Sequence, residues 1–170
     1  MLPSKFLHLK CLNIAVTGWS FSPASDLLSL VSFLDASPCL ETFDLQAPMR
    51  RQNHDLVFED PSHLGQFPGH CYENLRFVKI TSFCSANPLI KFARHILQHT
   101  TSLECLTLDI TAGGLRCSDD KVGECDVSKG TLVEAPKALV AIRTYIEGRV
   151  PSTVKLNVLE PCNRCSVVDA

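Results

Sequence analysis

The segment Leu103-Glu-Cys-Leu-Thr-Leu108 has the spacing L-x-x-Φ-x-Φ, with Φ an apolar residue, and this spacing recurs along the chain. Its last two apolar positions alternate with polar residues, which is typical of a half-buried strand. The leading leucine lies one turn earlier and is expected to pack in the same core.

Four copies of this pattern and one degenerate copy occur, and the leading leucines are 31, 35 and 28 residues apart. Recurrence at such a period is the signature of stacked supersecondary units. The copies are Leu9, Leu12, Ile14; Leu40, Phe43, Leu45; Leu75, Val78, Ile80; Leu103, Leu106, Leu108; and the degenerate Val154, Leu156, Val158.

Helical segments are predicted before three of these strands, over residues 24–36, 89–99 and 138–147. A proline lies at or just before each start (Pro23, Pro88 and Pro136), where its missing N–H costs nothing. Ser22 and Asn87 are expected to cap the first two helices.

Stacking these helix–turn–strand units predicts an α/β leucine-rich-repeat solenoid, a partial horseshoe. We expect a parallel sheet of about five strands, with helices on the convex side. Residues 1–170 are expected to form one domain. Residues 46–74 and 111–133 break the period and are predicted to be insertions, with a short extra strand at Val57 and Phe58.

Composition narrows the class of function. Apolar residues make up 45% and charged residues 20% of the chain, as in globular proteins. The net charge is −2 and the charges are scattered, so we expect no nucleic-acid partner. No apolar run approaches the roughly 20 residues of a membrane-spanning helix, so no membrane partner is expected. The nine cysteines, an odd number, suit reduced thiols and a cytoplasmic or nuclear location.

Several segments resemble plant F-box/LRR proteins, in particular the C-terminal LRR region of the FBD-related type abundant in grasses. They are residues 102–109, 116–117, 134–139, 145–146, 150–154 and 160–165. The resemblance implies an adaptor whose LRR region holds a target while an F-box docks onto a Skp1-type subunit of a ubiquitin ligase. The chain begins directly in a repeat strand, so we expect no F-box in it. A Skp1-type contact would then need a longer form that supplies one.

The candidate binding surface is the sheet face opposite the core, because side chains flanking the apolar strand positions point there. Its mixed charges and one aromatic side chain suit a protein partner of unknown identity. The candidates are Asn13, Thr42, Asp44, Phe77, Lys79, Thr107, Lys155 and Asn157. The alternative is a truncated structural remnant whose face is only solvated.

The sequence signals for a metal site or a catalytic site are weaker than the signal for a binding surface. Cys162 and Cys165 have the spacing of half a zinc site, and Cys117 and Cys125 could supply the other half of a zinc-stabilised binding domain. Four reduced thiols and no cofactor are the expectation.

His95 and His99 have the i, i+4 spacing of metal ligands, but no H-E-x-x-H glutamate lies between them. His99 is expected to act as a cation near a helix C-terminus. No nucleophile elbow, phosphate loop or dinucleotide-binding turn occurs, so no enzymatic activity is expected.

Overall fold

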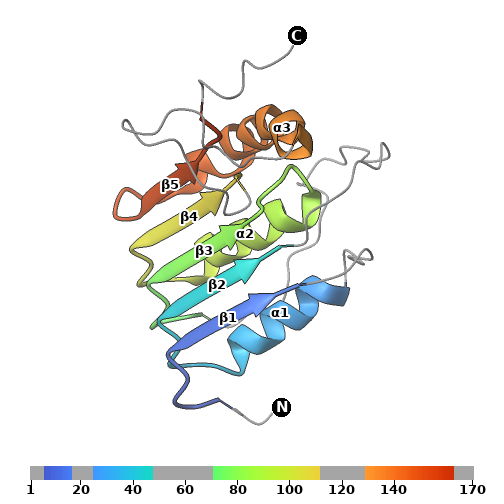
Figure 1. Ribbon diagram of the computed structural model, residues 1–170. Coiled ribbons are helices and arrows are strands. Elements are labelled where there is room, and N and C mark those ends of the chain that lie inside the picture. Colours follow the sequence, from blue (N-terminus) through green and yellow to red (C-terminus); the bar gives the residue numbers. More distant parts are fainter. Residues whose placement is uncertain (1–5, 17–24, 48–70, 112–128, 163–170) are drawn as a thin grey trace, which may run out of the picture.

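Five parallel strands lie side by side in chain order in the computed structural model, which describes residues 6–16, 25–47, 71–111 and 129–162 (Figure 1). The strands are β1 Cys11–Ala15, β2 Thr42–Gln46, β3 Phe77–Thr81, β4 Cys105–Asp109 and β5 Lys155–Leu159. Each strand therefore coincides with one predicted copy of the repeat.

The register of the sheet aligns equivalent positions of the repeat. Leu12, Phe43, Val78, Leu106 and Leu156 form one column across the five strands. Ile14, Leu45, Ile80, Leu108 and Val158 form a second column on the same face. The period of two thus directs every apolar position to one side of the sheet.

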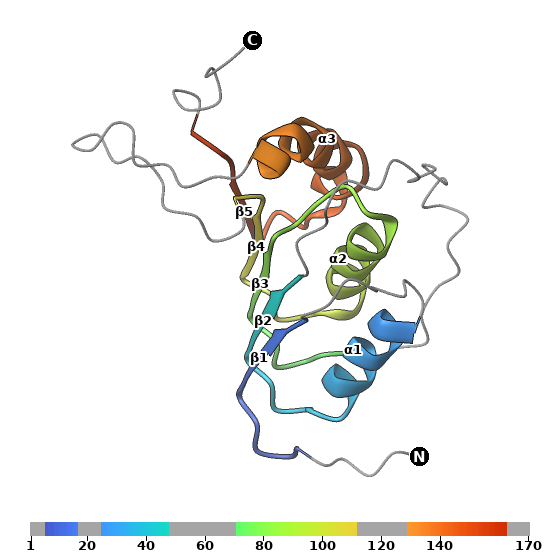
Figure 2. The ribbon, with the colours of Figure 1, turned by 45° about the vertical axis from the view of Figure 1, so that its right-hand side comes forward.

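Three helices cover that apolar side (Figure 2). They are α1 Ser25–Asp35, α2 Asn87–His99 and α3 Lys129–Tyr145, and the short 3-10 helix η2 Glu147–Arg149 follows α3. In Figure 2, no helix of the described residues covers the opposite side of the sheet. The prediction of a parallel sheet with helices on one side is therefore confirmed.

The core lies between the sheet and the helices. The column residues of β2, β3 and β4 are at most 2% exposed, and Ile90, Phe92, Ala93 and Ile96 of α2 are fully buried against them. The rings of Phe43 and Phe92 meet with centroids 5.9 Å apart. Burying each such side chain contributes roughly 1.5–3 kcal/mol, so these contacts dominate the stability of the sheet–helix layer.

The two outer strands bury their apolar columns less completely. Leu12 and Ile14 of β1 are half-buried, and so are Leu156 and Val158 of β5. Among the described strands, β1 has only β2 beside it and β5 has only β4 beside it, so each outer strand has a neighbour on one side only.

The third helix begins at Lys129, so the predicted start at Ala138 was wrong. Pro136 lies inside the helix on its exposed side, where a missing N–H and a local bend are tolerated best. Buried Ala135, one turn before Ala138 and Ala141, extends the apolar face upstream of the proline. The first turns of α3 consequently take up the last residues of the predicted 111–133 insertion.

Of the two predicted helix N-cap residues, the structure describes only the one at α2. Helix α2 starts at Asn87 itself, and the N-cap position belongs to Ala86, whose extended backbone (φ −64°, ψ 128°) carries no side-chain cap. The prediction of Asn87 as the cap was therefore wrong by one residue, whereas Pro88 does lie in the first turn. Ser22 lies outside the described residues.

Both ends of the predicted 46–74 insertion belong to the fold. Gln46 closes β2, and the backbone N–H of the buried Ala47 donates to the Thr81 carbonyl at 3.0 Å. Near the other end, Tyr72 is buried and pairs with Thr100 as an isolated parallel bridge. Val57 and Phe58 lie outside the described residues.

Ser82 turns the chain out of β3 with a left-handed backbone (φ 61°). This conformation is unfavourable for residues other than glycine and asparagine. Directly afterwards, the N–H of Phe83 donates to the Asp109 carbonyl at 2.9 Å, which ties the turn to the end of β4.

No helix in the described part of the chain has the length and apolarity needed to cross a bilayer.

Candidate protein-binding surface

The sheet face without helices carries two columns of register-aligned side chains, which we call the exposed sheet face. The first column is Cys11, Thr42, Phe77, Cys105 and Lys155. The second column is Asn13, Asp44, Lys79, Thr107 and Asn157. All eight predicted surface residues therefore share one face, together with Cys11 and Cys105.

Exposure on this face varies by position. Asn13, Phe77, Lys79 and Lys155 are exposed, whereas Thr42, Asp44, Thr107 and Asn157 are half-buried. Asp44 and Lys79 stand opposite each other in register on neighbouring strands, so a negative and a positive charge lie side by side near the middle of the sheet. This arrangement can pair with complementary charges on another protein.

Phe77 projects from β3 with 42% of its surface exposed. The Arg76 guanidinium lies 5.5 Å from the centroid of its ring, within the range of a cation–π contact. Arg76 is itself oriented by Glu104, whose Oε1 accepts a hydrogen bond from Nε at 2.7 Å. The exposed aromatic ring is therefore positioned by a neighbouring strand before any partner arrives.

A polar contact orders the other end of the face. The Asn157 side-chain amide donates to Sγ of Cys105 at 3.2 Å, across β4 and β5. The hydroxyl of Thr107 lies 3.7 Å from the same sulfur. This contact could not be predicted from the sequence, because neither cysteine nor asparagine indicates such a pairing unless the register is known.

A row of side chains of alternating charge precedes four of the strands, and the repeat pattern alone did not predict it. Its members are Lys10, Glu41, Arg76 and Glu104, each immediately before the first residue of its strand. Lys10 pairs with Glu41 at 2.9 Å, and this hydrogen bond and charge raise the pKa of Lys10. Arg76 pairs with Glu104. Reading one position upstream of each repeat would have revealed the alternation.

A polar cluster, buried at Tyr72 and His95 and half-buried at Asp35, lies between α1 and α2. The Tyr72 hydroxyl donates to Oδ1 of Asp35 at 3.0 Å and lies 3.0 Å from Nε2 of His95. Burial raises the pKa of Tyr72, and the adjacent Asp35 carboxylate adds to the effect. Burial, and then the neighbouring His99, lower the pKa of His95 to about 4, while Asp35 opposes the shift.

His95 therefore remains neutral near pH 7, and its Nε2–H donates to the tyrosine oxygen. The His99 ring stacks on the His95 ring with centroids 4.2 Å apart. Nδ1–H of His99 donates to the His95 carbonyl at 3.0 Å. The i, i+4 histidine pair joins α2 to Tyr72.

The zinc prediction concerns residues that the structure mostly does not describe. Cys117, Cys125 and Cys165 lie outside the described ranges, and Cys162 is half-buried. No group of three or more His, Cys, Asp or Glu side chains that could hold a metal occurs within those ranges.

A repeat of strand, helix and polar turn, stacked in register with the described helices on one side of the sheet, defines a leucine-rich-repeat domain. Comparison with protein families agrees: the family described as "At1g61320/AtMIF1, LRR domain" matches residues 1–163. The chain belongs to this family and is a plant leucine-rich-repeat protein. Searches among curated proteins and among solved structures each found no match. A leucine-rich-repeat domain indicates protein–protein interaction as the general class of function.

Proposed function

We propose that this chain recognises a protein partner through the exposed sheet face, which lines the concave side of a leucine-rich-repeat solenoid. The observation that carries the proposal is the pair of register-aligned columns that five successive repeats present on the side without helices. Repeat domains use such surfaces for extended contacts, because neighbouring repeats supply equivalent positions at regular spacing.

Phe77, Asp44 and Lys79 form the centre of the proposed contact. An exposed aromatic ring held beside Arg76 can be buried by a partner at little cost in conformational entropy. Asp44 and Lys79 set opposite charges on adjacent strands, which selects for a partner with the complementary pair. A face with this mixture of polar groups suits a folded protein or peptide better than a hydrocarbon ligand.

The finer role that we propose is substrate recruitment, as in the LRR region of an F-box adaptor of a ubiquitin ligase. The resemblance of residues 102–165 to plant F-box/LRR proteins supports this role. Contact with a Skp1-type subunit would then be made by an F-box in a longer form. The proposal includes a cytoplasmic or nuclear location, no cofactor and no catalysis by this chain.

The test is affinity capture from plant extract with the tagged chain and two triple variants. The surface variant carries Asp44→Lys, Phe77→Ala and Lys79→Glu. The control variant carries Glu147→Lys, Val140→Ala and Arg143→Glu at exposed positions of α3 and η2, and it repeats the same charge changes.

We expect the wild type and the control variant to retain the same discrete partner and the surface variant to lose it. A Skp1-type or cullin protein among the captured proteins would support the finer role. If all three chains recover only a common background of chaperones, the recognition proposal fails and the remnant alternative stands. If the control variant alone loses the partner, the helix side is the binding surface.

A further inference from the structure

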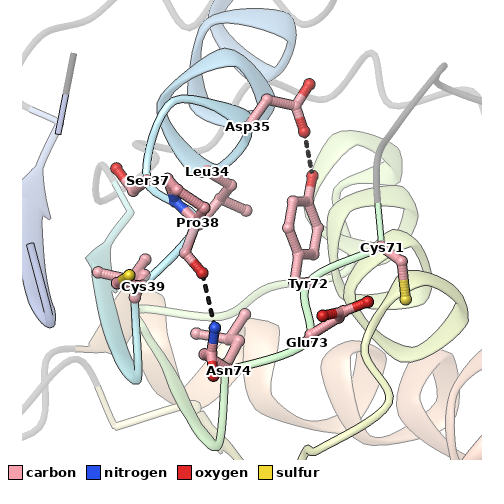
Figure 3. Close-up of a pocket in the computed structure, with 11 residues that line it drawn as sticks. Leu34, Asp35, Ser37, Pro38, Cys39, Cys71, Tyr72, Glu73 and Asn74 are labelled. Atoms are coloured by element: carbon pink, nitrogen blue, oxygen red, sulfur yellow. Dashed lines mark hydrogen bonds between the residues drawn. The ribbon is translucent and has the colours of Figure 1, made fainter. Parts of the chain in front are cut away.

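A pocket of about 320 Å³ lies at the edge of the sheet where β2 and β3 begin, beside the end of α1 (Figure 3). One wall is the end of α1 and the turn that leads into β2, including Asp35, Pro38 and Cys39. The other wall is the segment before β3, including Tyr72 and Glu73. Its volume is at the low end of the roughly 300–1,000 Å³ range of ligand sites, which suits one side chain better than a large ligand.

The pocket has a buried apolar floor. Leu34, Leu40 and Leu75 line it and are each at most 3% exposed, so its deep surface is already packed. The Asn74 side-chain amide donates to the Pro38 carbonyl at 2.9 Å, a bond that ties one wall to the other (Figure 3). The pocket is therefore pre-formed, and an occupant would spend little free energy in ordering it.

The two charged side chains among the described lining residues of the pocket are both carboxylates. Asp35 and Glu73 line it, and none of its described lining residues is Lys, Arg or His. Asp35 is also the last residue of α1, where the helix dipole places partial negative charge, and the last turn of α1 has no basic residue. Tyr72 anchors one oxygen of Asp35 by donating to Oδ1, which fixes the carboxylate at the pocket wall.

We propose that this pocket binds a single Lys or Arg side chain of a protein partner, at a second contact site that shares no residue with the exposed sheet face. The aliphatic stem of such a side chain matches the floor of Leu34, Leu40 and Leu75. Its cationic end can pair with either carboxylate, Asp35 or Glu73, which lie at opposite ends of the Tyr72 ring (Figure 3). Both carboxylates would repel an acidic occupant, and an apolar occupant would make no ion pair with them.

This inference rests on the proposed function only in that the partner is a protein. A small probe tests it without that partner. The probe is N-acetyl-arginine methylamide, compared with the N-acetyl methylamides of norleucine and of glutamate. Binding is followed from the backbone amide resonances of residues 34–40 and 71–75.

We expect saturable millimolar binding of the arginine probe and no comparable binding of the other two. Glu73→Gln and Asp35→Asn should each weaken it roughly three- to fivefold, as expected for a partly exposed ion pair. Glu147→Gln removes the same charge from the exposed η2 and should change nothing. The triple variant at Asp44, Phe77 and Lys79 should also bind normally, which separates this site from the proposed function. Equal shifts with the norleucine probe, equal loss in Glu147→Gln, or no shift at the solubility limit would each overturn the proposal.

A second readout uses the chain's own thiols and does not depend on the Asp35 variant. Cys39 and Cys71 are exposed and line opposite walls of the pocket (Figure 3). The exposed Cys11 on β1 is the reference. We expect cationic methanethiosulfonate reagents to outpace anionic ones more at Cys39 and Cys71 than at Cys11, and this preference should shrink in Glu73→Gln. Equal cation-to-anion ratios at all three thiols would contradict a cation-selective pocket.

Discussion

Protonation of His95 is predicted to destabilise the fold as the pH falls from 6.5 to about 4. The side chain is only 3% exposed, and burial, reinforced by His99, lowers its pKa from 6.5 to about 4 despite the opposing Asp35. Between these values the unfolded chain binds a proton that the native chain does not, so stability is lost as pH falls. The full contribution of neutral His95 is present above pH 6.5.

The size of the effect follows from the same two values. A pKa difference from 6.5 to about 4 corresponds to a loss of roughly 3 kcal/mol when the pH reaches 4. A loss of this size is a large part of the free energy of unfolding of a typical domain, which is about 5–15 kcal/mol. The free energy of unfolding should therefore respond visibly to this one histidine.

The assay is urea unfolding followed by circular dichroism from pH 8 to pH 4. The wild type is compared with His95→Gln, which keeps an amide donor for the Tyr72 oxygen but does not titrate. Subtracting the two profiles of unfolding free energy against pH cancels the contribution of the carboxylates, which is common to both chains. His8→Gln, at an exposed histidine, is the matched control.

We expect the difference between wild type and His95→Gln to change by roughly 2–3 kcal/mol across this window, with His8→Gln following the wild type. A difference that stays constant from pH 8 to pH 4 would refute the assignment of His95 as a buried neutral group.

Three further predictions concern stability. Phe92→Ala removes a fully buried ring packed on Phe43 and should cost roughly 3–5 kcal/mol in urea unfolding, and a cost below about 1 kcal/mol would contradict the described core. A double-mutant cycle on Arg76 and Glu104 should give a coupling below about 1 kcal/mol that falls further in high salt, because both side chains are about half exposed (46% and 48%). Ser82→Gly should raise the melting temperature and Ser82→Val should lower it, each by an amount equivalent to about 1 kcal/mol, because φ is 61° there. The same change in both variants would show that the left-handed backbone is not decisive.

The strands and their exposed face could be predicted because they depend on local alternation. Once Leu103, Leu106 and Leu108 are aligned with their counterparts, a period of two assigns each neighbouring residue to one face. The predicted column from Asn13 to Asn157 therefore coincides with the register of the sheet.

Features that depend on distant contacts could not be predicted in this way. Tyr72 follows no periodic pattern, and its burial depends on Asp35 and His95, 37 and 23 residues away in the chain. The early start of α3 depends on the burial of Ala135, which outweighs the local rule that places Pro136 at a helix start. The pocket beside Asp35 and Glu73 exists only because two separate turns meet.

Site-specific photo-crosslinking tests the central claim, recognition through the exposed sheet face, most directly. A benzophenone amino acid would replace Phe77 in one chain and Val140, an exposed residue of α3, in another. Both chains would be irradiated in plant extract, and the crosslinked bands compared. Recognition through the exposed sheet face predicts a discrete partner crosslinked from position 77 and not from position 140. Crosslinking from position 140 alone would contradict it.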